Sequence, residues 1–101
     1  MAGNIGYKRK LFSDKTNIPL GSSVSYNLID EFGNYSMVVV CIHCAQYGGI
    51  FVVPIWGQFS SYTPFVAVPT EYFTLTNSAG VITITPTQMG LNPAIVAYRL
   101  C

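Results

Sequence analysis

Apolar residues gather in two β-branched runs near the middle of the chain, separated by a short segment with two adjacent glycines. The runs cover residues 35–45 and 50–57. Two such runs on either side of a glycine turn predict a β-hairpin. In an extended strand Val38 and Val40 face one side and Val39 the other, so the first run is apolar on both faces. We therefore expect a central strand that is covered twice, with the domain's own second sheet as one cover and a neighbouring subunit as a candidate for the other.

Weaker patterns on either side of this hairpin predict further strands. Residues 22–29 alternate between polar and apolar, which indicates a half-exposed strand. Pro54 interrupts the second central run, so we expect that strand to be bulged there or to lie at a sheet edge. The remaining expected elements are a short strand near 7–12, a turn at 30–34, a short strand at 65–68, a hairpin over 72–85 that turns through 76–80, and a last strand over 94–100.

Seven or so short strands, turn-linked hairpins and the lack of a helical period predict an all-β fold. The expected architecture is an antiparallel β-sandwich of jelly-roll-like form. Residues 1–21 are expected to form an extended N-terminal lead-in segment, and residues 22–101 the β-sandwich domain. The chain of 101 residues is long enough for one hydrophobic core.

Charge is scarce along most of the chain. Only 9% of the residues are charged, and after Phe32 only Glu71 and Arg99 carry charge. A surface covered by Ser, Thr, Asn and Gln is one explanation. The other is that much of the surface is buried between subunits, because the centres of protein interfaces are depleted in charge. We expect a homo-oligomer.

Several classes of function are disfavoured by the same composition. A net charge of +1 argues against general nucleic-acid binding, and the cluster Lys8–Lys10 is interpreted as a solvated end. The first residues do not resemble a signal peptide, and the apolar runs are too short to span a bilayer. We expect a protein made in a cytoplasm, without membrane insertion.

A metal site is one interpretation of the cluster Cys41, His43 and Cys44, because these residue types bind metals. In a strand, however, Cys44 faces away from the other two. We interpret them as buried thiols beside a core histidine. His43 is the only histidine, and the pair Gly48–Gly49 is expected to form the hairpin turn rather than a phosphate-binding loop. The sequence therefore predicts no catalytic residue, no metal, no cofactor and no enzymatic activity.

Uncharged aromatic residues in the loops are the best candidates for ligand binding. Such side chains can stack on sugar faces, while neighbouring amides and hydroxyls bind sugar hydroxyls. The alternative for Trp56 and Phe59 is that they close one end of the sandwich. The candidate ligand-binding residues are Tyr47, Trp56, Gln58, Phe59 and Tyr62.

Three motifs resemble the small all-β modules at the tips of bacteriophage tail fibres and related receptor-binding proteins. They are the entry 33–35 into a valine-rich strand, the hairpin 72–85 through Asn77–Gly80, and the closing strand that ends at 97–100. The resemblance implies a non-enzymatic structural and adhesive virion protein, a homotrimer that binds a bacterial surface glycan or other virion proteins. A capsid decoration protein and a free carbohydrate-binding module are the alternatives.

The three cysteines are expected to be free thiols. Cys41 and Cys44 lie on opposite faces of one strand and are too poorly aimed to form a disulfide. Thiol titration of the unfolded, unreduced protein should therefore give three equivalents per chain. A lower value would contradict the expectation.

Overall fold

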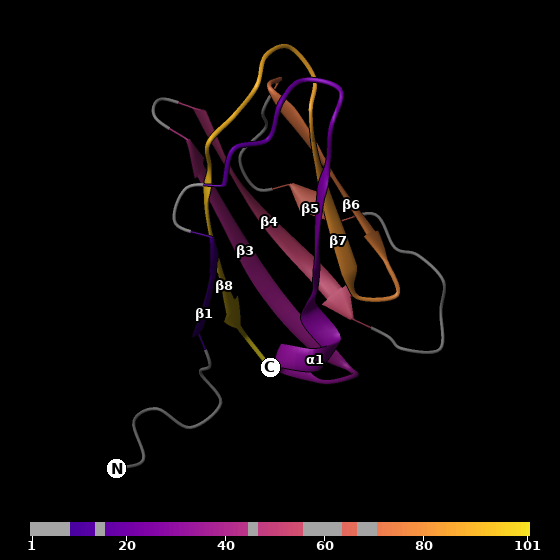
Figure 1. Cartoon of the computed structure of the whole chain (residues 1–101). Helices are drawn as coiled ribbons and strands as arrows, with labels where there is room; N and C mark the ends of the chain where they lie inside the picture. Colours follow the sequence, from indigo (N-terminus) through magenta and orange to yellow (C-terminus); the bar gives the residue numbers. More distant parts are fainter. Residues whose placement is uncertain (1–8, 14–15, 45–46, 56–63, 67–70) are drawn as a thin grey trace.

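The chain forms eight β-strands and one short α-helix within residues 9–13, 16–44, 47–55, 64–66 and 71–101, which a computed structural model describes. The elements are β1 (Arg9–Ser13), β2 (Val24–Asn27), α1 (Leu28–Phe32), β3 (Ser36–Cys44), β4 (Tyr47–Ile55), β5 (Phe65–Val66), β6 (Phe73–Ser78), β7 (Val81–Pro86) and β8 (Ala94–Arg99). All strand pairs are antiparallel, in a five-stranded sheet of order β1-β8-β3-β4-β5 and a three-stranded sheet of order β2-β7-β6 (Figure 1). The predicted all-β sandwich is confirmed.

The predicted central hairpin is present, but its turn lies elsewhere. The β3–β4 pairing runs from Ser36 opposite Ile55 to Cys44 opposite Tyr47. Gly48 and Gly49 therefore lie inside β4, and their assignment to the turn is wrong. A Cβ atom at the second glycine would lie 2.6 Å from the ring of Phe51, so this glycine leaves room for a buried aromatic side chain.

Pro54 lies in β4 opposite Met37, in a ladder without a register shift. The Met37 N–H donates to Cys101 O at 2.9 Å, and Met37 O accepts from the Leu100 N–H at 2.7 Å. Both backbone groups of Met37 thus point away from β4, so the proline occupies a position that exchanges no hydrogen bonds with β3. On the other side of β4, the described part of β5 pairs only with Phe51 and Val52, not with Pro54. The proline ring is therefore tolerated, as it is at a sheet edge.

The helix α1 occupies part of the segment expected to be strand and turn. The Asn27 side chain caps it by accepting hydrogen bonds from the backbone N–H groups of Ile29, at 2.9 Å, and Asp30, at 3.2 Å. Gly33, at φ +84°, ends it by donating its N–H to Ile29 O at 2.7 Å. Five residues are too few to show a helical period in the sequence.

The second predicted hairpin joins β6 to β7 through a tighter turn than expected. Only Ala79 and Gly80 form the turn, at φ +50° and +88°. Two positive φ values are typical of a type I′ turn, whose twist suits antiparallel strands. Asn77 belongs to the strand, where its buried side chain donates to Pro54 O at 2.9 Å and accepts from the Gly80 N–H at 2.9 Å. This side chain therefore links the two sheets.

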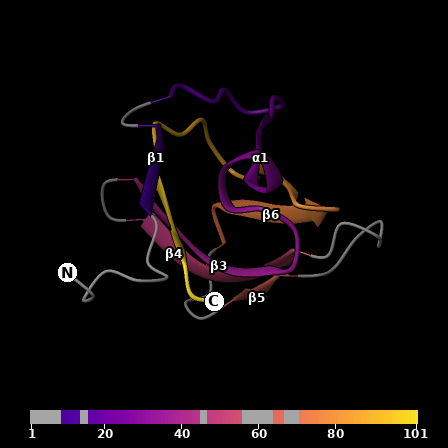
Figure 2. The same cartoon turned by 90° about the horizontal axis from the view of Figure 1, so that it is seen from below.

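The hydrophobic core lies between the sheets, and α1 covers the end where β3 begins (Figure 2). β3 contributes Val38 and Val40, both fully buried, while Leu28 and Phe32 enter from α1. The buried residues are Ile18, Leu28, Phe32, Val38, Val40, Ile42, Phe51, Val53, Ile55, Phe73, Leu75, Ile82, Ile84, Leu91, Ile95 and Ala97. The predicted cover of the central strand by a second sheet of the same domain is thereby confirmed.

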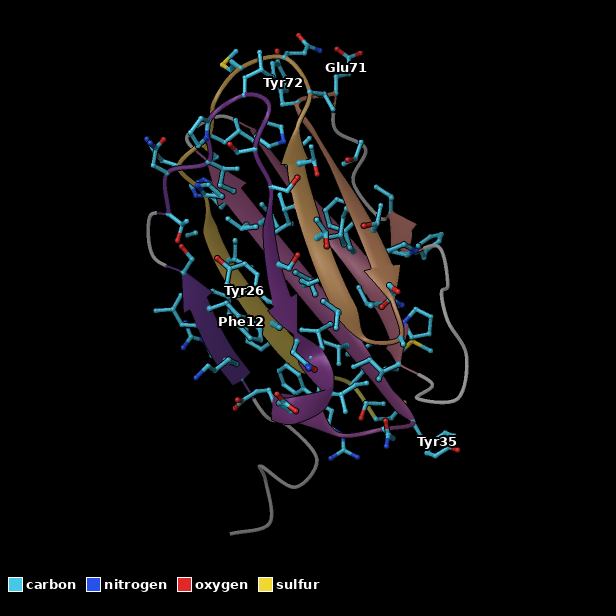
Figure 3. All side chains as sticks on the ribbon, turned by 45° about the vertical axis from the view of Figure 1, so that its right-hand side comes forward. Phe12, Tyr26, Tyr35, Glu71 and Tyr72 are labelled. Atoms are coloured by element: carbon cyan, nitrogen blue, oxygen red, sulfur yellow. The ribbon has the colours of Figure 1, made fainter. Side chains whose placement is uncertain are left out.

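Parts of the segment expected to be a lead-in belong to the sandwich. β1 pairs with β8, and Phe12 of β1 packs against Tyr26 of β2 with ring centroids 5.1 Å apart (Figure 3). Ile18 is fully buried and exchanges two backbone hydrogen bonds with Leu91, at 2.7 and 2.9 Å. These contacts join the sheets along one side and at the end remote from α1.

The β6–β7 turn offers a stabilising substitution. Ala79 has a left-handed conformation, which is unfavourable for alanine, whereas Asn–Gly is the preferred pair of a type I′ turn. Ala79→Asn should raise the free energy of unfolding by about 0.5–1 kcal/mol, measured by urea denaturation. As a control, Gly80→Ala should lower it, because φ is +88° and the added Cβ would collide with Ile29. Equal stability of all three proteins would contradict the assignment of the turn.

Candidate interaction surfaces

The predicted ligand-binding residues fall almost entirely outside the described part of the chain. Trp56, Gln58, Phe59 and Tyr62 lie outside it, and of Tyr47 only the backbone is described. The predicted site therefore remains a prediction.

Four of the predicted residues belong to the loop of residues 56–63, and the described residues on either side of this loop show where it is attached. The strand β4 begins at Tyr47 and ends at Ile55, and the loop of residues 56–63 follows Ile55. Eight residue steps in an extended strand separate the two positions by about 26 Å. Pro64, where the described chain resumes, precedes β5, whose Phe65 pairs with Val52 in the second half of β4. Both ends of the loop thus lie toward the α1 end of the sheet, opposite to Tyr47.

The thiols and the histidine of β3 divide between its two faces. Cys44 packs against the core, and its Sγ accepts a hydrogen bond from the Asn92 N–H at 3.3 Å. Cys41 and His43 face outward, as the strand pattern predicted. The interpretation of His43 as a core histidine is wrong: its side chain is exposed, because its neighbours across the strands are Gly48 and Ala94, which are too small to cover a ring.

No group of three His, Cys, Asp or Glu residues within the described ranges could hold a metal ion. Asp30 and Glu31 lie on α1, beside the start of β3, whereas His43 lies near its other end. Burial raises the pKa of the Cys41 thiol. This cysteine is therefore a weak nucleophile at neutral pH, since the thiolate is the reactive form.

The outer face of the five-stranded sheet is apolar across its centre, with Arg9 and His43 at its margins. The register places Tyr98, Val39 and Val52 side by side in one row, across β8, β3 and β4. Exposed fractions reach 45% at Leu11 and 67% at Phe65, on the two edge strands. We call this surface the apolar face. It consists of Leu11, Met37, Val39, Cys41, Ile50, Val52, Pro54, Phe65, Val96 and Tyr98.

The outer face of the three-stranded sheet has the opposite chemistry. Hydroxyl side chains alternate with the core residues of all three strands, and we call this surface the hydroxyl face. Two cross-strand pairs are hydrogen-bonded, Ser23 with Thr85 and Ser25 with Thr83, each at 2.8 Å. The face consists of Ser23, Ser25, Thr74, Thr76, Ser78, Thr83 and Thr85.

These two surfaces reconcile the two explanations of the low charge. The hydroxyl face of the three-stranded sheet fits the first explanation, a polar surface without charge. The apolar face of the five-stranded sheet fits the second, a surface suited to burial. The sequence contains the signal for both. Thr74–Thr76 and Thr83–Thr85 alternate hydroxyl and apolar residues, whereas 50–53 and 95–97 are apolar without a break.

No protein-family model, no curated protein and no solved structure matches the chain. Within the residues that the structure describes, no helix is both long and apolar enough to cross a membrane.

Aspartate on the two faces of β3 should have unequal effects. Val40→Asp should lower the free energy of unfolding by about 3–5 kcal/mol, because it leaves an unpaired charge in the core. In the isolated chain, Val39→Asp should lower it by only about 1 kcal/mol, because there the carboxylate stays in contact with water at the apolar face. Circular dichroism and urea denaturation measure both effects. Equal losses would show that the outer side of β3 is as enclosed as the inner side.

Proposed function

We propose that the protein is a non-enzymatic structural and adhesive protein of a virion, which works as a homo-oligomer and binds a bacterial surface glycan. The resemblance to fibre-tip modules supports the virion assignment and implies three subunits. The observation that carries the proposal is the contrast between the two outer faces of the sandwich, one apolar and one covered by hydroxyl groups.

The apolar face favours an assembling protein over a free carbohydrate-binding module. Solitary soluble proteins rarely leave a broad apolar patch in contact with water, because its burial is favourable. A module that works alone would be expected to carry polar side chains on both outer faces. In this chain only the three-stranded sheet meets that expectation, with Thr74, Thr76 and Thr83 in its exposed rows.

Glycan binding is proposed for the loop that joins β4 to β5. Three of the candidate aromatic residues, Trp56, Phe59 and Tyr62, occur in it together with Gln58. Their rings can stack on sugar faces while the amide binds hydroxyls. Tyr47 starts β4, about 26 Å from the strand's other end, which the loop follows.

Loop and strand-start variants test this proposal. Tyr62→Ala and Phe59→Ala should each weaken adhesion to host cells or to a glycan array by about 1–3 kcal/mol, the usual effect of losing an anchoring aromatic ring. Tyr47→Ala removes the remaining predicted tyrosine, at the opposite end of β4, and unchanged adhesion of this variant would restrict the site to the loop. Melting temperatures should stay close to that of the wild type.

Unchanged adhesion of both loop variants would refute the loop as the glycan site. A large fall in melting temperature would instead show that these rings close the end of the sandwich, which is the structural alternative stated for Trp56 and Phe59.

A further inference from the structure

Within the part of the chain that the structure describes, the outward side of β3 has no second layer like the one that covers its inward side. Inward, Val38 and Val40 are fully buried beneath the three-stranded sheet. Outward, Val39 and Cys41 are half-buried, and among the described residues their neighbours across the strands belong to their own sheet, with no layer above them. A strand that is apolar on both faces is typical of a sheet covered on both sides.

We propose that the apolar face packs against the same face of a second copy of this chain, across a twofold axis that passes between Val39 and Cys41. This inference deepens the proposed function, because it names the contact through which the protein assembles. The two copies would form a four-layered particle with the five-stranded sheets in its middle and the hydroxyl faces outside.

The charge on this face fits a second copy better than a charged partner. Among the described residues of the outer rows, the one side chain with a permanent charge is Arg9, which lies beside Tyr98 on the edge strand β1. The centre of the face is uncharged. It can therefore meet an identical surface without opposing like charges, which would be destabilising in a buried contact.

The size of the face also suits such a contact. The lengths of the five strands and a spacing of about 4.8 Å give a flat footprint of about 500 Å² per copy. A pair would then bury about 1,000 Å² as flat footprint, the minimum for a specific interface, against about 1,200–2,000 Å² in typical stable ones. The true area exceeds the footprint, because side chains rise from the sheet. Packed sheets lie about 10 Å apart, a distance that branched side chains such as Val39 and Val52 fill.

The twofold arrangement follows from the position of the face. β3 is the middle strand of five, and Val39 and Cys41 are the middle pair of its outward residues. A surface that meets a copy of itself closes with two chains, because both copies use the same patch and residues at its centre meet near the twofold axis. The geometry thus favours two chains over the three that the resemblance implies. Uncharged at neutral pH, the Cys41 thiol is suited to this buried position.

Cys41 provides a direct test, because it is the one cysteine on the apolar face. In the full chain with Cys101→Ser, the remaining Cys44 faces the core. Light scattering and sedimentation should give twice the chain mass of 11.0 kDa. A maleimide should modify Cys41 slowly in this dimer, because the partner copy covers the thiol, and the reaction should disappear when Cys41→Ser is added.

Two further variants assign this association to the apolar face. Val39→Asp should weaken association more than about a hundredfold, since two unpaired carboxylates would meet at the axis. The released chain should expose Cys41, whose modification by a maleimide should become about tenfold faster. Thr76→Asp is the matched control, because it places the same charge on the hydroxyl face. It should leave both the mass and the rate unchanged.

Several outcomes would overturn the pairing. A monomer with a rapidly modified Cys41 would show an uncovered face, and a monomer with a protected Cys41 would show a cover from the chain itself. Binding of a monomer to phosphatidylcholine vesicles would identify a lipid surface as the occupant. A stable trimer, or equal dissociation by Val39→Asp and Thr76→Asp, would also contradict it. None of these outcomes tests the glycan-binding proposal, because that proposal is tested separately by measuring adhesion.

Discussion

The strand β3 is hydrogen-bonded on both sides, to β4 and to β8, and carries apolar side chains on both faces. The two ladders align apolar residues of three strands into continuous rows, above and below the sheet. Because side chains in a strand alternate, a slip of one residue would exchange the two faces. In this sheet both faces are apolar, so hydrophobicity alone does not choose which one is buried.

The three-stranded sheet helps to determine which faces form the core. Its strands alternate cleanly, with Leu75, Ile82 and Ile84 directed inward and hydroxyl groups directed outward. Such a sheet has only one face that can enter a core. The five-stranded sheet meets it with the face that contains Phe51, whose ring lies 5.7 Å from that of Phe73 and occupies the space left by Gly49.

Contacts between distant parts of the chain hold the sheets in this relation. Along its described strands the chain passes between the sheets four times, and the passages from β1 to β2 and from β7 to β8 place the pairs β1–β8 and β2–β7 in different layers. Ile18 and Leu91 join the connecting segments, and the Asn77 amide reaches from the small sheet to Pro54 of the large one. The hydroxyl of buried Ser36 donates to Phe32 O at 2.7 Å, which ties α1 to the start of β3.

The sequence alone determined the class of fold and most of its strands, because the alternation of residues such as Val24, Ser25 and Tyr26 depends only on local geometry. It did not reveal α1, whose five residues depend on a cap, or that the β3–β4 turn comes before Gly48 and Gly49, because Gly49 is needed inside the strand to leave room for the ring of Phe51. Of the candidate surfaces, it indicated a charge-poor exterior without dividing it into two chemistries. That division required the tertiary structure, because which strands become neighbours, and which apolar face turns inward, is decided by contacts between segments far apart along the chain.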